Sequence, residues 1–133
     1  MAYLKPQVFL RRLFNPLAMR FGIGGAVTLS VVGRRTGEAR SVPVIPIEQD
    51  GVCYLVAAHG ETEWVRNLRA AGTGELRTKG KTERFRATEI SVGERAPIIA
   101  TYRRVAGKTV TAYFAALPEP ADHPVFRIES RGI

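Results

Sequence analysis

Six short strands in a small antiparallel barrel, with helices between them, are the fold that the sequence predicts, a mainly β domain of the α+β class. Runs rich in β-branched and aromatic residues recur along the chain and are bounded by turn residues. Most connections between the runs favour hairpins rather than the strand–helix alternation of a parallel sheet. The expected strands are residues 26–33, 41–49, 52–59, 74–80, 82–90 and 124–130.

An N-terminal amphipathic segment over residues 1–25 is expected to precede a single barrel domain over residues 26–133. Its apolar side chains alternate with Arg11, Arg12 and Arg20, a pattern typical of a helix, and Pro16 should kink or break it. Such a helix could cap a pocket, contact a second copy of the chain or rest on an acidic membrane surface. The pattern leaves these three roles open.

Turn chemistry defines the first half of the barrel. Asp50-Gly51 joins the second and third expected strands and is a strong hairpin signal, because both positions tolerate positive φ. Pro43 and Pro46 interrupt backbone donors in the second strand, so it should be bulged or lie at an edge. Gly80-Lys81 predicts a second tight turn between the fourth and fifth strands.

Helical spacing appears in two later segments. Trp64 and Leu68 recur at helical period within residues 62–71, with Thr62 as the expected N-cap. Residues 94–107 also predict a helix, which should end at Gly107. Residues 109–118 fit a helix or a strand equally well.

The charge of the chain points to an anionic partner. Twenty basic residues oppose twelve acidic ones, for a net charge of +8, and most of this excess lies within residues 1–40. A basic segment attracts nucleic-acid phosphate, acidic lipid or a small phosphorylated or carboxylated ligand. The single cysteine, Cys53, excludes an internal disulfide framework, and its apolar neighbours predict a buried thiol.

Other features of the sequence narrow the class of protein to which the chain can belong. The longest apolar run, residues 52–58, is far shorter than the roughly 20 residues of a membrane-spanning helix. The start of the chain lacks a signal-peptide pattern, so we expect a cytoplasmic protein. His59 and His123 are the only histidines and have no metal-ligand spacing, so no metal site is expected.

Residues 33–40, with the sequence GRRTGEAR, form the cluster with the clearest chemistry. Arg34, Arg35 and Arg40 crowd a single turn with Thr36 and Gly37. Guanidinium groups donate forked hydrogen bonds to phosphate or carboxylate, and glycines let a turn present backbone N–H groups. The turn therefore predicts an anion site, although a solvated hairpin tip would show the same spacing.

Trp64 and Asn67 form a second cluster, three residues apart on neighbouring parts of one helical face. An aromatic ring and an amide in this arrangement could line a pocket for a flat ligand, and Trp64 could equally be core. A basic alternating hairpin around Arg84 and Arg86 could contact nucleic acid. The basic strands lack a set of stacked aromatic residues, so no nucleic-acid partner is expected.

The segments VTLSVVGRRTGEARSVPV, YLVAAHG and EWVRNLRA resemble the deazaflavin-dependent nitroreductase and quinone reductase family of actinobacteria. The resemblance covers residues 15–90 and implies a split β-barrel of the flavin-reductase, FMN-binding type. It also implies coenzyme F-420, an 8-hydroxy-5-deazaflavin, as cofactor, with FMN the less favoured alternative. Family members are commonly dimers, so a homodimer is expected.

The resemblance assigns the predicted cofactor site residue by residue. It implies that the arginine turn holds the phosphate and acidic tail, that the end of the third strand lies beside the deazaflavin ring, and that the W-x-x-N helix motif faces the same cofactor. The implied cofactor-binding residues are Arg34, Arg35, Thr36, Gly37, Arg40, Pro43, Ala57, Ala58, His59, Trp64 and Asn67.

Hydride transfer from reduced F-420 to a small-molecule quinone, enone or nitro-type acceptor is the activity that the resemblance implies. A phenol could donate a hydrogen bond to the oxygen that gains charge, which makes Tyr102 and Tyr113 the catalytic candidates. Where relatives carry a ring-flanking tyrosine this chain has Ile45, and HGETE is a shortened loop without the lysine of those relatives. A non-catalytic lipid or fatty-acid carrier on the same barrel therefore remains an alternative.

Overall fold

The computed structural model describes residues 25–78 and 80–130, which form a curled antiparallel sheet with helices packed against it. This is the mainly β, α+β architecture that the sequence predicts. The strands are β1 (Val27–Val32), β2 (Ala39–Val44), β3 (Ile47–Gln49), β4 (Val52–Val56), β5 (Thr73–Thr78), β6 (Lys81–Glu89) and β7 (Val125–Ser130).

The strand order β2-β1-β5-β6-β7-β4-β3 contains seven strands where the sequence predicts six. The expected second strand is divided, because Pro46 has no N–H to continue a ladder and the chain leaves the sheet at Ile45. β2 pairs with β1, whereas β3 pairs with β4 at the opposite edge of the sheet. Pro43 lies in β2 at an edge, as its chemistry requires.

The link between β2 and β3 explains why the sheet curls. A flat sheet of this size would hold its edges about 29 Å apart, at about 4.8 Å per strand spacing. Val44 and Ile47 are only three peptide steps apart, so their Cα atoms lie within about 11 Å. The two edges must therefore approach each other, which bends the sheet into a split barrel. We call the two linking residues, Ile45 and Pro46, the seam.

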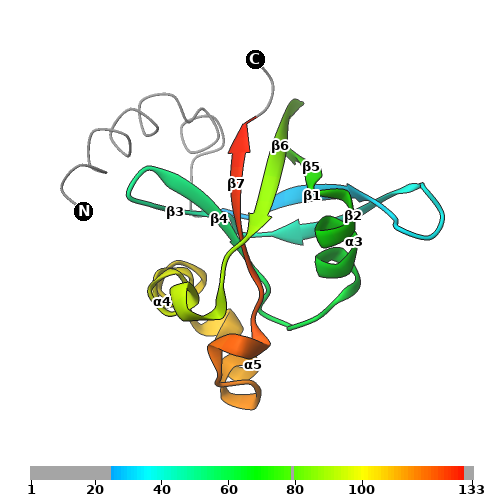
Figure 1. Cartoon of the computed structure of the whole chain (residues 1–133). Coiled ribbons are helices and arrows are strands. Elements are labelled where there is room, and N and C mark those ends of the chain that lie inside the picture. Colours follow the sequence, from blue (N-terminus) through cyan, green and yellow to red (C-terminus); the bar gives the residue numbers. More distant parts are fainter. Residues whose placement is uncertain (1–24, 79, 131–133) are drawn as a thin grey trace, which may run out of the picture.

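The Asp50-Gly51 hairpin between β3 and β4 is present as predicted. Asp50 has φ 54° and Gly51 has φ 79°, so both central residues adopt the left-handed conformation of a type I′ turn. Figure 1 shows this hairpin and the β1–β2 hairpin pointing away from the body of the fold on opposite sides.

The helices cover two separate parts of the sheet. α3 (Glu63–Ala71) follows Thr62 at the predicted N-cap position and contacts β1, β5 and β6. α4 (Arg95–Ala106) ends at Gly107 as predicted, and the ambiguous segment forms the short helix α5 (Thr111–Ala116). Figure 1 shows α4 and α5 together, away from α3. Three 3₁₀ turns complete the described elements: Val92–Glu94, Gly107–Val110 and Pro120–Asp122.

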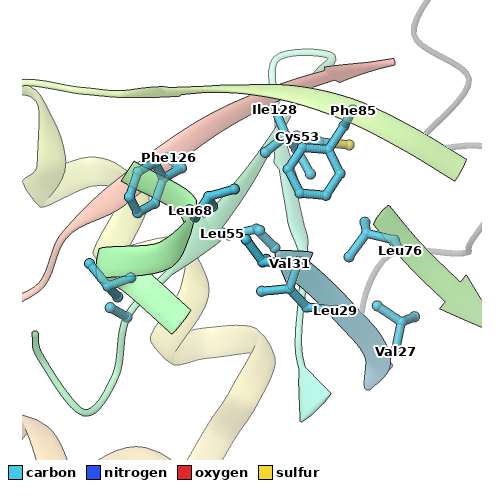
Figure 2. Packing of buried hydrophobic residues seen from close by; sticks show 12 residues of the cluster. Val27, Leu29, Val31, Cys53, Leu55, Leu68, Leu76, Phe85, Phe126 and Ile128 are labelled. Atoms are coloured by element: carbon cyan, nitrogen blue, oxygen red, sulfur yellow. The ribbon is translucent and has the colours of Figure 1, made fainter. Parts of the chain in front are cut away.

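Two apolar cores stabilise this arrangement. The first fills the barrel with side chains from β1, β4, β5, β6, β7 and α3, shown in Figure 2, and includes Cys53 as a buried thiol. Phe85 is fully buried there and lies opposite Gly74, where an added Cβ would be 2.8 Å from the ring. The second core packs α4 and α5 against β3, β4 and β7.

The predicted N-terminal amphipathic helix over residues 1–25 lies almost wholly outside the described residues, so its role stays a prediction, as does the domain boundary after it. No helix among the described residues is long and apolar enough to cross a membrane. Those residues also contain no group of three or more side chains suited to a metal ion.

Candidate functional site

A cavity of about 710 Å³ opens between the β1–β2 hairpin, the end of β4, α3 and α4. This volume lies within the range of about 300–1,000 Å³ that small-molecule sites usually occupy. Most of the residues that the sequence predicts for a site line this cavity: Arg34, Arg35, Thr36, Arg40, Pro43, Ala58, His59, Trp64, Asn67 and Tyr102.

The β1–β2 turn forms the cationic end of the cavity and is closed on itself. The Gly33 N–H donates to the Glu38 carbonyl at 2.7 Å, and the Gly37 N–H donates to the Gly33 carbonyl at 2.9 Å. Gly37 has φ 78°, a conformation that an L side chain would strain. The Thr36 hydroxyl accepts from the Glu38 N–H at 3.2 Å. Local hydrogen bonds therefore fix the turn before any ligand contributes.

Arg34 fastens this turn to α3. Its backbone N–H donates to Asn67 Oδ1 at 3.1 Å, and its Nη1 donates to the same oxygen at 2.7 Å. The same Nη1 also donates to Glu63 Oε1 at 2.9 Å. This guanidinium holds the pKa of the Glu63 carboxyl below its usual value, chiefly through the hydrogen bond. Asn67 thus shapes the cavity through Arg34.

Arg35 and Arg40 are the uncommitted cations of the turn. Both line the cavity and are exposed, and neither makes an ion pair or a hydrogen bond with the residues that the structure describes. Arg34 is paired with Glu63, so Arg35 and Arg40 are the cavity-lining arginines of the turn that make no ion pair with the residues that the structure describes. An anion is the ligand group that complements them.

The opposite end of the cavity is apolar. Val42, Val44 and Ile45 line it from β2 and the seam, and Val56 and Ala58 line it from the end of β4. Trp64 lies between this surface and the barrel core, because it lines the cavity and also packs 6.1 Å from the Phe126 ring centroid. The cavity therefore has an apolar part, which we call the slot, and a cationic end at the β1–β2 turn, which we call the mouth.

Three of the predicted residues do not line the cavity. Gly37 lies within the turn and supports its shape, while Ala57 is buried in the barrel core, where its carbonyl accepts from the Gly60 N–H. Tyr113 lies outside, with its ring 4.0 Å from that of His59, which does line the cavity.

Tyr102 is the tyrosine of the predicted pair that lines the cavity. It lies on α4, is 6% exposed and packs 6.2 Å from the Phe114 ring centroid. Burial raises the pKa of its phenol, and the nearby Tyr113 raises it further. The hydroxyl therefore keeps its proton at neutral pH and remains available as a donor.

An alkaline titration tests the environment of Tyr102. As pH is raised, ultraviolet absorbance should show a late phase in which one tyrosine ionises at a higher pH than the usual pKa of about 10. Tyr102→Phe should remove that phase. Tyr113→Phe should keep this phase but move it slightly to lower pH, because Tyr113 adds to the raised pKa of Tyr102. Since the folded-state pKa is the higher one, the contribution to stability is complete below pH 10 or so and is lost as pH rises through the folded value. Simultaneous ionisation of all the tyrosines would contradict this assignment.

Several lining residues were not anticipated from the sequence: Val31, Ser41, Val42, Val44, Val56, Thr62 and Glu63. Glu63 was detectable, because it precedes Asn67 by four residues and so shares its helical face. Thr62 occupies the predicted N-cap position, but its side chain makes no capping hydrogen bond and its Oγ1 is buried without a partner among the described residues.

Comparisons with solved structures show the same fold class. A structure described as an F420-H2 dependent reductase shares 23% identity over 78% of this chain and 93% of that one, with a TM-score of 0.59. A NimC/NimA family protein from Clostridium acetobutylicum shares 15% identity over 95% and 92% of the two chains, with a TM-score of 0.60. HutZ, a heme storage protein from Vibrio cholerae, shares 13% identity over 98% and 92%, with a TM-score of 0.61. No curated protein matches the sequence significantly.

The fold and these likenesses define a split β-barrel protein of the class that includes F-420-dependent reductases. The model of the family described as F420H(2)-dependent quinone reductase matches residues 7–115. The chain therefore belongs to this family of oxidoreductases, and F-420 is the cofactor of the family.

Proposed function

We propose that this protein is an F-420-dependent oxidoreductase that transfers a hydride to a quinone, an enone or a nitro-type acceptor. The observation that carries the proposal is the cavity, which joins a cationic turn to an apolar slot. The donor set fits the coenzyme, because F-420 has a planar ring at one end and a phosphate with an acidic tail at the other. Its ring suits the slot, and its anionic end suits the arginines.

The residues of the turn would hold the anionic end of F-420. Arg35 and Arg40 supply the charge, while Arg34 and Thr36 shape the turn and add donors. Pro43, Ala58, His59 and Trp64 line the remainder of the cavity, so they would flank the ring. Asn67 would act through its hydrogen bonds to Arg34.

The chemistry that reduced F-420 supplies when bound is a hydride from its ring carbon. The acceptor would receive that hydride, a hydrogen nucleus with its electron pair, so negative charge would develop on the acceptor's oxygen until a proton is taken up from solvent. Tyr102, neutral and facing the cavity, would donate a hydrogen bond to this oxygen. Tyr113, which lies outside the cavity, would act only through its ring contact with His59.

A lipid or fatty-acid carrier is the second candidate function. Ile45 and the valines of β2 make one end of the cavity aliphatic, which suits an acyl chain. This alternative predicts a co-purifying acyl chain and no hydride transfer. Mass spectrometry of the small molecule released from natively purified protein separates deazaflavin, flavin and fatty acid in a single measurement.

Titration with F-420 tests the proposal directly. Trp64 lines the cavity and is the single tryptophan of the chain, so its fluorescence should change saturably as coenzyme binds. Reduced F-420 should then be oxidised when a quinone is added, as followed by the absorbance of the deazaflavin. Saturable binding of a fatty acid together with no response to F-420 would favour the carrier instead.

The state of assembly and the extent of the domain are part of this proposal. We expect a homodimer, to be checked by light scattering after gel filtration.

Comparing the thermal unfolding of the full chain with that of a chain that starts at residue 26 tests whether the barrel folds alone. Contact of residues 1–25 with membranes is checked by sedimentation with acidic vesicles.

A further inference from the structure

We propose that Glu63 is an internal counter-ion that competes with anionic ligand groups for Arg34. The proposal rests on the proposed function only where the ligand group is taken to be the phosphate of F-420. The pairing itself is a property of the turn and of α3. In this role Glu63 lowers the affinity of the cationic end for anions.

The geometry gives Arg34 two acceptors of different kinds. Its Nη1 donates to Asn67 Oδ1 at 2.7 Å and to Glu63 Oε1 at 2.9 Å. Asn67 is 5% exposed and also accepts from the backbone N–H of Arg34, so this neutral acceptor is fixed. The Glu63 side chain is 71% exposed, so its carboxylate is free to leave. A ligand anion can therefore replace Glu63 while Asn67 holds Arg34 in place.

A second cation is available to receive the displaced carboxylate. Arg66 Nη1 lies 3.7 Å from Glu63 Oε2, one helical turn further along α3, and its side chain is 49% exposed. Movement of Glu63 from Arg34 towards Arg66 needs only a rotamer change at an exposed position. The carboxylate thus keeps a positive neighbour after the exchange, which reduces the cost of displacing it.

The net charge of the cavity mouth makes the competition measurable. Glu63 lines the cavity together with Arg34, Arg35 and Arg40, so its charge lies close to any anion that the turn binds. One unit charge about 4 Å away changes an affinity by about five-fold in water. At about 1 M salt the screening length falls to about 3 Å, so most of this effect should disappear.

Replacement of Glu63 by glutamine tests the inference with inorganic phosphate as the probe. Backbone amide shifts of Arg34 and Gly37 should report phosphate binding about five-fold tighter to Glu63→Gln than to the native chain at low salt, and nearly equal binding at about 1 M salt. Glu61→Gln is the matched control. It removes the same charge and also breaks an arginine pair, but Arg69, its partner, does not line the cavity.

The outcomes separate this inference from the proposed function. Tighter phosphate binding by Glu63→Gln alone supports the counter-ion, even if F-420 binds neither protein and the proposed function fails. Unchanged or weaker phosphate binding overturns the counter-ion and shows that Glu63 only braces the turn. If F-420 binds the native protein but phosphate binds Glu63→Gln no more tightly than the native chain, the proposed function stands and the counter-ion is overturned.

Discussion

Simultaneous replacement of Arg34 and Arg40 by alanine is expected to weaken F-420 binding by about 100-fold or more. Hydrogen bonds to charged groups each contribute about 1.5–3 kcal/mol, and every 1.4 kcal/mol or so changes an affinity ten-fold. The loss of two such bonds therefore weakens binding by at least about two factors of ten. Arg34→Ala also removes the side-chain hydrogen bond to Asn67 and leaves only the one donated by the backbone N–H, which adds to the loss. Quenching of Trp64 fluorescence during titration with F-420 measures the change.

A control with the same loss of charge is needed, because net charge alone affects anion binding. Arg84 and Arg86 are exposed on β6 and do not line the cavity, so their double replacement by alanine removes two positive charges elsewhere. This control should bind F-420 within about two-fold of the native protein, since distant exposed charges are screened. If the Arg34 and Arg40 double variant binds F-420 with unchanged affinity, the turn does not belong to the coenzyme site.

Replacement of Phe85 by alanine should cost about 3–5 kcal/mol of unfolding free energy. The ring is fully buried in the barrel core, opposite Gly74 on β5. The missing Cβ at Gly74 gives the ring its space, since an added Cβ would lie 2.8 Å from Phe85 Cζ and 3.2 Å from the Ser30 carbonyl. Phe85→Ala therefore leaves a cavity that Gly74 has no side chain to fill.

Urea or guanidinium denaturation of purified proteins measures this cost. Val32→Ala provides the comparison, because Val32 is 52% exposed on β1 and should change the unfolding free energy by only about 0.5 kcal/mol or less. A Phe85→Ala protein with the stability of the Val32 variant would mean that the barrel core repacks around the lost ring.

Local chemistry was sufficient to predict most of the fold. The Asp50-Gly51 turn, the helix after Thr62 and the helix that ends at Gly107 all form as their residues indicate. The division between β2 and β3 was not predicted, although Pro46 marks it. A proline shows that a ladder is interrupted, but whether the strand bulges or changes partner depends on the far edge of the sheet, which local sequence does not describe.

The candidate site was predicted less completely, for a similar reason. The arginine turn and the Trp64 helix are short local patterns, and the structure brings both to the cavity. The partition of roles between the arginines depends on α3, some thirty residues away in the chain, whose Glu63 and Asn67 both accept from Arg34. Tyr102 and Tyr113 could not be separated by sequence, since only packing turns one towards the cavity and the other towards His59.

The seam at Ile45 and Pro46 has an evolutionary consequence. These residues join the two edge strands without contributing to any ladder, and Ile45 faces the cavity. A lineage could therefore exchange the side chain at this joint and alter which guest the barrel accepts, while every strand keeps its register. Because Ile45 also packs against the second core, the folded members of a library randomised at Ile45 should carry mostly apolar replacements there, each with its own preferred guest.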